Sequence, residues 1–142
     1  MSKMVMRITV AGGATAPTRA HPNDAGLDMY APYALTLAPG QRETIDTGIC
    51  IELPPYTFGR ITGRSSLAKK FGIEVFPGTV DEGYRGRIGI TLRNSSVVPY
   101  QICAGDRIAQ LIVIPCVYVE PVVVESLSRT QRGDSGFGST GR

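Results

Sequence analysis

No stretch between residues 1 and 125 shows helical periodicity over ten consecutive residues. Apolar residues instead alternate with polar ones over short runs, most clearly in residues 45–53 and 88–92. This period of two is typical of half-buried strands. The 17 glycines and 10 prolines of the 142-residue chain allow many turns between such runs. We therefore expect one all-β domain, a compact, jelly-roll-like sandwich or barrel of roughly eight to ten short strands.

The expected strands follow the chain from its start almost to its end. Further runs cover residues 4–10, 25–31, 58–62, 108–114 and 117–124, the last interrupted by Pro121. The one expected helix is short and lies within residues 63–72, where serines come early and a glycine comes last.

Composition and charge argue against several classes of protein. The net charge of +3 is spread along the chain, which suits a small anionic ligand and is too weak for a stable nucleic-acid complex. The three cysteines and the single histidine have neither disulfide-framework nor metal-ligand spacing, and this favours a reducing compartment. Residues 1–7 lack the apolar core of a signal peptide, and the run 111–119 is too short to span a bilayer. We expect a cytoplasmic protein without a membrane partner.

Residues 78–90, with the sequence GTVDEGYRGRIGI, carry more chemistry than a turn requires. Two extended segments flank the polar tip 81–86, a composition that predicts a β-hairpin. Two carboxylates, a tyrosine and two arginines follow within seven residues. A solvated turn needs little more than Gly, Asn or Asp, so the tip is either an ordinary turn or part of a site.

Other polar positions also allow a structural and a functional interpretation. Ser65 and Ser66 could cap the helix or, together with Arg64, bind phosphate through hydroxyls, free N–H groups and a cation. Asp28, a carboxylate in a short extended run, could cap a turn or face a site. Gln110 interrupts an apolar strand, and because a buried amide needs partners, it either pairs with backbone or faces a site.

The tail, residues 128–142, differs in kind from the rest of the chain. Its glycines recur around one aromatic residue, Phe137, with arginine, serine and threonine nearby. Such a segment cannot bury enough apolar surface to order by itself. It is either a disordered end or a lid that orders over a bound anion. We place the domain boundary here, with a β domain at 1–127 and a flexible tail at 128–142.

Five stretches, in order along the chain, resemble the motifs of the trimeric dUTP diphosphatase (dUTPase) family. They are residues 25–31 (AGLDMYA), 63–68 (GRSSLA), 78–90 (given above), 105–111 (GDRIAQL) and 132–141 (RGDSGFGSTG). Each is a weak match alone, but five in register over residues 25–141 make a specific one.

The resemblance implies a chemical reaction. It implies hydrolysis of dUTP to dUMP and pyrophosphate by attack of an activated water on the α-phosphate, which limits uracil in DNA and supplies dUMP for thymidylate synthesis. Mg²⁺ would be carried mainly on the triphosphate, with no direct protein ligand. Asp81 matches the general base that orients and deprotonates the water, and the lack of a usable histidine agrees with a carboxylate in this role.

The resemblance also implies how the substrate is bound. Tyr84 would pack under the deoxyribose and exclude a 2′-hydroxyl, and the backbone around Gly78 and Gly89 would form the uracil slot. The implied phosphate-binding residues are Arg64, Ser65, Ser66 and Gln110, with Asp28 supporting the site. The tail residues implied to close over the base and the γ-phosphate are Arg132, Phe137, Ser139 and Thr140.

Family members are homotrimers whose sites lie between subunits, with the lid from a third chain, so the same assembly is implied here. One departure from the family pattern lies beside the expected slot, where Pro77 lacks an N–H and Thr79 adds a hydroxyl.

A dCTP deaminase or a bifunctional enzyme would share the fold, but residues 67–69 carry no deaminase signature. A nucleotide-binding regulatory module is the alternative from another class, and the complete set of Asp81, Gln110 and Phe137 argues against it. The sequence identifies no regulatory protein partner, and the glycine- and arginine-containing tail argues against a purely structural β-sandwich.

Overall fold

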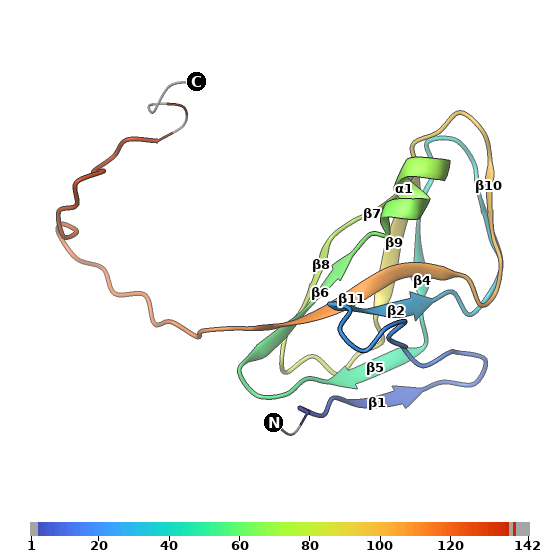
Figure 1. Ribbon diagram of the computed structural model, residues 1–142, viewed down its shortest axis with the longest axis horizontal. Helices are drawn as coiled ribbons and strands as arrows, with labels where there is room; N and C mark the ends of the chain where they lie inside the picture. The colour runs from blue at the N-terminus through green and yellow to red at the C-terminus, as the bar shows by residue number, and fades with distance from the viewer. Residues whose placement is uncertain (1–2, 137, 139–142) are drawn as a thin grey trace.

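The computed structural model describes residues 3–136 and 138 of the chain. This part contains eleven β-strands and one short α-helix (Figure 1). The strands are β1 (Arg7–Val10), β2 (Gly26–Tyr30), β3 (Leu35–Leu37), β4 (Arg42–Asp46), β5 (Ile49–Glu52), β6 (Thr57–Thr62), β7 (Ile73–Val75), β8 (Gly78–Val80), β9 (Gly89–Asn94), β10 (Tyr100–Ile102) and β11 (Arg107–Pro115), and the helix is α1 (Ser65–Phe71). The prediction of an all-β fold with one short helix is confirmed.

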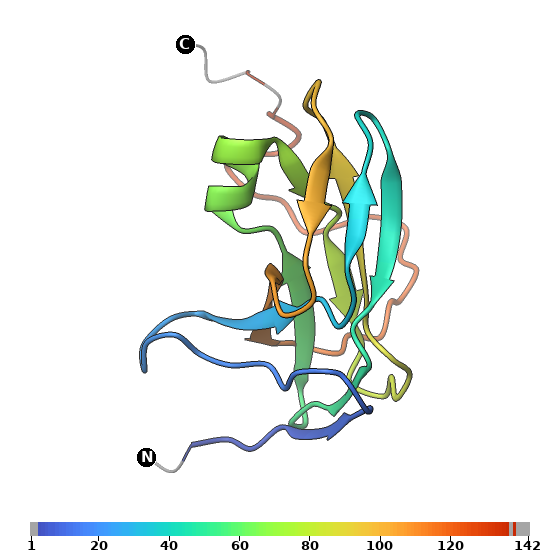
Figure 2. The same cartoon turned by 90° about the vertical axis from the view of Figure 1, so that its right-hand side faces the viewer.

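The strands pair in four antiparallel sheets. The largest has the order β2-β11-β6-β8, a second has the order β4-β9-β7, and β1-β5 and β10-β3 form two-stranded sheets. Most neighbours are far apart in sequence, so the chain crosses repeatedly between sheets, as expected for a jelly-roll-like fold. Figures 1 and 2 show α1 at one end of the β structure and β1 at the other.

The sheets enclose one apolar core. Its largest fully buried side chains come from eight of the strands and include Met29, Leu37, Ile45, Ile49, Ile51, Ile73, Ile90, Leu92, Ile102, Ile108 and Leu111. In β9 the alternation expected from the sequence is confirmed, because Ile90 and Leu92 are fully buried while Arg93 between Leu92 and Asn94 is exposed. Burial of this alternating set fixes the register of each strand, since a slip of one residue would expose it.

The expected strand over residues 45–53 is divided in two by a glycine. Gly48 has a φ of 70°, in the left-handed region that favours glycine, and it separates β4 from β5. Its N–H donates to Oδ1 of Asp46 over 2.9 Å. That hydrogen bond, helped by Arg87, lowers the pKa of Asp46 and keeps it an anion.

The hairpin prediction for residues 78–90 is wrong in one respect, because its two arms do not pair with each other. β8 pairs with β6, whereas β9 pairs with β4 and β7 in a different sheet. Ile88, just before β9, exchanges backbone hydrogen bonds with Ile49 and Thr47. Residues 81–87, here called the connecting loop, therefore link two sheets.

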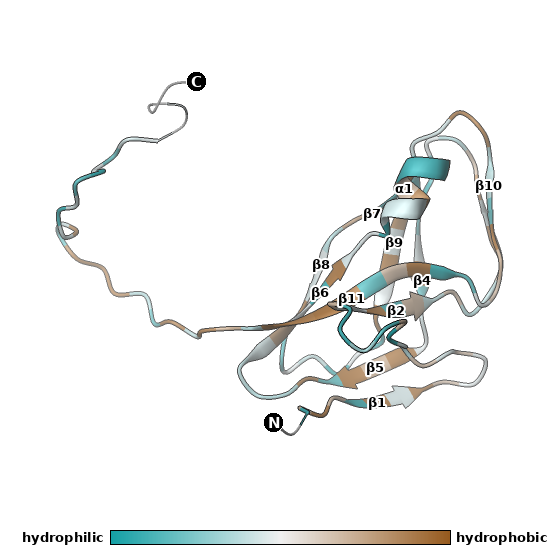
Figure 3. Cartoon of the chain, in the orientation of Figure 1, coloured by the Kyte–Doolittle hydropathy of each residue, from teal (hydrophilic) through white to brown (hydrophobic). Residues whose placement is uncertain are grey.

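The chain beyond β11, drawn in orange to red, leaves the β structure (Figure 1). Every residue from 117 to 135 is exposed, and residues 117–124, expected as a last strand, form none. A strand needs a partner for its backbone N–H and C=O groups, and the part of the chain that the structure describes offers none here. The first part of this segment is nevertheless apolar (Figure 3), with Val119 79% and Val123 99% exposed. We call residues 116–127 the arm.

The helix described here is too short and too polar to cross a membrane, and the other described residues form no helix that could do so.

Candidate active site

A polar cavity of about 530 Å³ lies where the 20–25 loop, β2, β11 and the start of α1 meet. It is lined by Ala20, His21, Asp24, Ala25, Gly26, Asp28, Arg64, Ser65, Ser66, Arg107 and Gln110. All five residues predicted to bind or support the phosphates are among them. We call this the phosphate cavity.

Asp28 organises the cations of the phosphate cavity. Its largely buried carboxylate lies 3.7 Å from Nε of Arg64 and 3.5 Å from Nε of Arg107. Nη1 of Arg64 also donates to the backbone oxygen of Arg107 over 3.3 Å. One carboxylate thus orients two guanidinium groups. Together the three groups carry a net positive charge, which favours binding of an anion. Asp28 lies within β2 and caps no turn.

Arg107 is the site residue that sequence reasoning missed. A hydrogen bond to the Tyr30 hydroxyl, with the nearby Asp28, raises the pKa of Arg107. The Tyr30 hydroxyl also bonds Thr18 over 2.5 Å, and these two contacts lower its pKa. Arg107 stands in the GDRIAQL motif, so the available signal was a second cation three residues before Gln110.

A β-bulge brings Arg107 and Gln110 to the same cavity. Residues three apart on a regular strand point to opposite faces. The pairing of β11 with β2 shifts register between Arg107 and Ala109, and such an extra residue reverses the alternation. Both side chains therefore line the phosphate cavity.

The two serines do not cap the helix. The N-cap of α1 is Arg64, with no side-chain cap hydrogen bond, and α1 ends at Gly72 in the left-handed conformation. In the described residues, the hydroxyls of Ser65 and Ser66 have no hydrogen-bond partner, so they are available to a ligand in the phosphate cavity.

Gln110 is held from two sides. Its Nε2 donates to the backbone oxygen of Gly63 over 3.1 Å. Its Oε1 lies against Gly26, where an added Cβ would overlap it. The absence of a side chain at residue 26 therefore allows the amide to reach the cavity.

A smaller cavity of about 210 Å³ lies on the connecting loop and β8. It is lined by Ile61, Gly78, Thr79, Val80, Asp81, Tyr84, Arg87, Ile88 and Gly89. The structure thus brings together the four residues predicted for the base, the sugar and the catalytic carboxylate. We call this the slot.

The connecting loop is tightly anchored. Arg85 and Arg87 form ion pairs with Glu52 and Asp46, at 3.5 and 3.2 Å. The Tyr84 hydroxyl donates to the backbone oxygen of Arg87 over 2.9 Å. The tyrosine ring lies over Gly86, where an added Cβ would overlap the hydroxyl and the ring.

The two carboxylates of the loop differ in their contacts. Glu82 accepts two hydrogen bonds and does not line the slot. Asp81 lines the slot, and within residues 3–136 its carboxylate has no hydrogen-bond or ion-pair partner. The free carboxylate is the one that can take a proton from a water, which distinguishes Asp81 as the candidate base.

The tail residues do not join either cavity in the described part of the chain. Nε of Arg132 donates to the backbone oxygen of Ser135 over 2.7 Å, and Arg132 lines neither the phosphate cavity nor the slot. The predicted residues Phe137, Ser139 and Thr140 lie outside the described residues.

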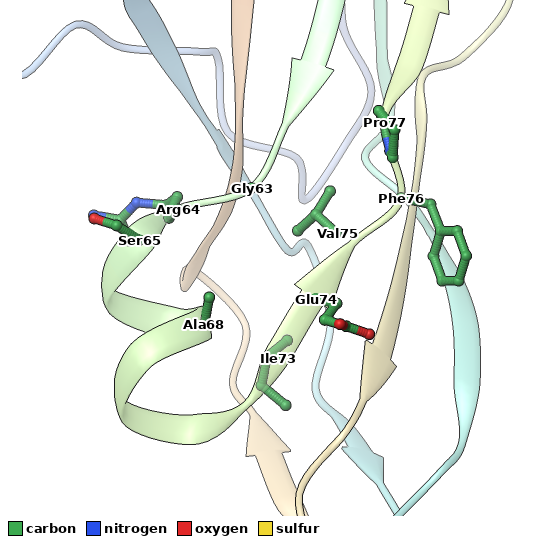
Figure 4. Close-up of a pocket in the computed structure, with 9 residues that line it drawn as sticks. All are labelled: Gly63, Arg64, Ser65, Ala68, Ile73, Glu74, Val75, Phe76 and Pro77. Atoms are coloured by element: carbon green, nitrogen blue, oxygen red, sulfur yellow. The ribbon is translucent and has the colours of Figure 1, made fainter. Parts of the chain in front are cut away.

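A more apolar hollow of about 590 Å³ adjoins the phosphate cavity between the start of α1 and β7. Figure 4 shows Arg64 and Ser65 at its edge, with Ile73, Val75 and Ala68 between the helix and the strand. It holds no group suited to acid–base chemistry other than Glu74, which points away from the helix (Figure 4).

An all-β fold that gathers cations and free hydroxyls in one cavity, and presents an unpaired carboxylate in another, is typical of an enzyme acting on a small phosphorylated ligand.

The family is shown by comparison with known proteins. The family model described as dUTPase matches residues 13–141. The deoxyuridine 5′-triphosphate nucleotidohydrolases of Leifsonia xyli subsp. xyli and monkeypox virus are 48% and 47% identical to this chain, each over 128 residues. The matches cover 88% and 90% of this chain and 84% of each relative. The G164S mutant of the Staphylococcus bacteriophage 80alpha dUTPase, solved with dUpNHpp, superposes with a TM-score of 0.93 at 27% identity, covering 99% of this chain and all of that one. The chain belongs to the dUTPase family.

Proposed function

We propose that this protein hydrolyses dUTP to dUMP and pyrophosphate, with Asp81 as the general base for water attack on the α-phosphate. The observation that carries the proposal is the Asp81 carboxylate, which lines the slot and has no partner among the described residues. Membership of the dUTPase family supports dUTP as the substrate of this protein. A base positioned in this way contributes roughly 10²–10⁴-fold to the rate.

Hydrolysis in ¹⁸O-labelled water tests which phosphorus is attacked. Attack on the α-phosphate puts the label in dUMP and leaves pyrophosphate unlabelled. Label in orthophosphate, with dUDP as the other product, would contradict the proposal.

The slot suits a nucleoside. Backbone groups around Gly78 and Gly89 would pair with uracil, and the Tyr84 ring would pack under the deoxyribose and exclude a 2′-hydroxyl. Thr79 also lines the slot, so its hydroxyl adds a polar group beside the base.

Replacing Gly86 by alanine tests the position of Tyr84. The new Cβ would overlap the tyrosine hydroxyl and ring, so the ring must move. We expect kcat/KM for dUTP to fall by about 10- to 100-fold, and the preference for dUTP over UTP to narrow. Gly83→Ala, in the same loop with open space around its Cβ, is the matched control and should stay within about twofold of the wild type. Equal kinetics for the two variants would rule out this role for the ring.

The phosphate cavity suits a triphosphate. Arg64, Ser65, Ser66 and Gln110 would bind phosphate oxygens, Arg107 would add a second guanidinium, and Asp28 would hold both cations in place.

Mg²⁺ is proposed to enter on the triphosphate. Among the described residues, no group of three or more His, Cys, Asp or Glu side chains could hold a metal ion, and Asp28 is engaged by two arginines. Mg²⁺ commonly keeps several waters and binds through substrate phosphates. The metal would neutralise phosphate charge there, while the residues of the phosphate cavity orient the chain of phosphates.

We propose a homotrimer with the active sites between subunits. The phosphate cavity and the slot share no lining residue, so a second chain can bring a slot to a phosphate cavity. The exposed apolar arm and a largely apolar cavity of about 470 Å³ beside β1, lined by Met4, Met6, Ile8, Leu27 and Val113 among others, are apolar surfaces that such assembly would bury. Light scattering at micromolar concentration should give three times the mass of 15.2 kDa, and a monomeric mass would contradict the assembly.

The proposed domain organisation is a β domain at residues 1–127 and a lid at 128–142. Arg132, Phe137, Ser139 and Thr140 would close over the base and the γ-phosphate of a site formed by other subunits. The glycine-rich composition supports a segment that orders only with ligand.

In the cell, this activity would limit uracil in DNA and supply dUMP for thymidylate synthesis. We propose a cytoplasmic location, with neither a stable nucleic-acid complex nor a membrane partner. The free state of Cys50, Cys103 and Cys116 supports a reducing compartment.

A further inference from the structure

Glu82, the residue after the proposed base, lines a cavity that the dUTP-binding roles above do not use. This cavity, of about 670 Å³, is also lined by Phe58, Arg60, Thr79, Asp81, Gly83, Cys116 and Tyr118. It shares Thr79 and Asp81 with the slot. The segment that carries Asp81 therefore forms part of the wall of two cavities.

Three segments that are distant in sequence meet at the Glu82 carboxylate. Its Oε1 accepts a hydrogen bond from the backbone N–H of Tyr56 over 2.5 Å and one from the Tyr118 hydroxyl over 2.9 Å. The rings of Tyr56 and Tyr118 pack with centroids 5.8 Å apart. The N–H of Cys116 donates to the backbone oxygen of Tyr56 over 2.8 Å.

The backbone of Tyr56 is adapted to this contact. Its φ of 58° makes it the one non-glycine residue with a positive φ in the described part of the chain. Such a conformation in a tyrosine persists where surrounding contacts hold it. Here those contacts are the carboxylate at its N–H, the Cys116 N–H at its carbonyl and the ring of Tyr118.

We propose that Glu82, Tyr56 and Tyr118 form a latch that ties the connecting loop to the root of the arm, and that Glu82 is thereby a positioning residue for hydrolysis. The latch acts one residue from Asp81, through the Glu82 side chain, whereas Arg85 donates to the backbone oxygen of Glu82 over 2.8 Å. This inference rests on the proposed role of Asp81. Because the arm is the segment we propose to join subunits, the latch also links assembly to the position of the base.

The protonation of Tyr118 is consistent with the latch. The hydrogen bond to Glu82, with burial and the negative charges of Glu82, Cys116 and Asp81 after it, raises the pKa of Tyr118 to about 12. A hydroxyl whose pKa is raised in the folded protein contributes to stability. This contribution is complete at pH values below the ordinary tyrosine pKa, near 10. That contribution is lost as the pH rises from about 10 through about 12.

The first test compares Glu82→Ala with Glu82→Gln in the full-length protein. Glu82→Ala leaves the Tyr56 N–H and the Tyr118 hydroxyl without their acceptor, and we expect kcat for dUTP to fall by about 10- to 100-fold with KM nearly unchanged. Glu82→Gln keeps an oxygen acceptor at the same place and should restore kcat to within about threefold of the wild type. An inactive Glu82→Gln would show a chemical role for the carboxylate, and an unimpaired Glu82→Ala would show no role; either result overturns the proposal.

Two tyrosine variants provide a matched pair. Tyr118→Phe removes the hydroxyl that bonds Glu82 and keeps the packed ring, so kcat should fall by about 5- to 10-fold. Tyr56→Phe removes a hydroxyl that has no partner among the described residues, and its kcat should equal that of the wild type. Tyr118→Phe combined with Glu82→Ala should be no slower than Glu82→Ala alone, whereas additive losses would contradict a single latch.

A spectroscopic measurement tests the latch without turnover. Phenolate absorbance at 295 nm, followed from pH 9 to 12 while circular dichroism monitors folding, should show a late-titrating tyrosine in the wild type. That step should be absent in Tyr118→Phe and move toward pH 10 in Glu82→Ala. Failure of the wild type to hydrolyse dUTP would remove the proposed function, but this titration would still decide whether the latch exists. Identical titrations of the wild type and Glu82→Ala would show that it does not.

Discussion

Asp81→Asn is expected to lower kcat for dUTP by about 10²- to 10⁴-fold while leaving nucleotide binding nearly intact. The amide keeps the shape of the side chain but cannot take a proton from the attacking water. Asp81 has no protein partner among the described residues, so the substitution breaks no contact that holds the slot together. The measurements are pyrophosphate release at saturating dUTP and calorimetric binding of a non-hydrolysable dUTP analogue.

Glu82→Gln is the matched control for this substitution. It makes the same change in charge at the adjacent residue, whose carboxylate lies outside the slot, and it should remain active. If Asp81→Asn kept more than about a tenth of the wild-type kcat, the base would have to be another group.

Truncation after Gln131 is the second change with a large expected effect. We expect kcat to fall by orders of magnitude while nucleotide affinity changes much less. Ordering a glycine-rich segment costs conformational free energy that a bound ligand must offset. Closure would expel water and fix the triphosphate for in-line attack. The free energy of the contacts between tail and nucleotide would then offset the cost of ordering the tail and positioning the phosphates. Little of it would appear as tighter nucleotide binding.

A tryptophan reporter tests the same segment in the full-length protein. The chain has no tryptophan, so Phe137→Trp gives a single emitter. Its emission should change when a non-hydrolysable dUTP analogue binds. The double variant Asp81→Asn with Phe137→Trp should show the same change with the same analogue. Unchanged emission, together with full activity of the truncated protein, would show that the tail takes no part in the reaction.

Strand alternation was sufficient to predict the fold class, because burial of one face leaves a period of two in the sequence. The pairing of residues 78–90 was not predictable from that pattern. β8 and β9 flank a turn-like loop, as hairpin strands do, but their partners are β6 in one sheet and β4 and β7 in another. Partner choice depends on contacts between residues distant in sequence, which local periodicity does not contain.

The phosphate-binding side chains were predictable from their motifs, whereas their geometry was not. The β-bulge that turns Arg107 toward the same cavity as Gln110 leaves no local sign in a run of apolar residues. Ser65 and Ser66 had an equally good interpretation as capping residues. Only the position of the N-cap at Arg64 shows that their hydroxyls are not used in this way.

The arm shows why a period-two pattern need not give a strand. Residues 117–124 have the composition of a strand, but they lie exposed, because no strand edge among the described residues pairs with them. The missing partner is supplied by another chain in the assembly we propose. The proposed assembly would also account for the division of the site residues between two cavities.

Selective hydrolysis of dUTP is tested by measuring pyrophosphate release from dUTP, dCTP, dTTP and UTP with the purified protein in the presence of Mg²⁺. We expect rapid release from dUTP and much slower release from the other three, because the slot would exclude a 5-methyl group and a 2′-hydroxyl and pair with uracil alone. Comparable release from dCTP, or no release from dUTP, would contradict it.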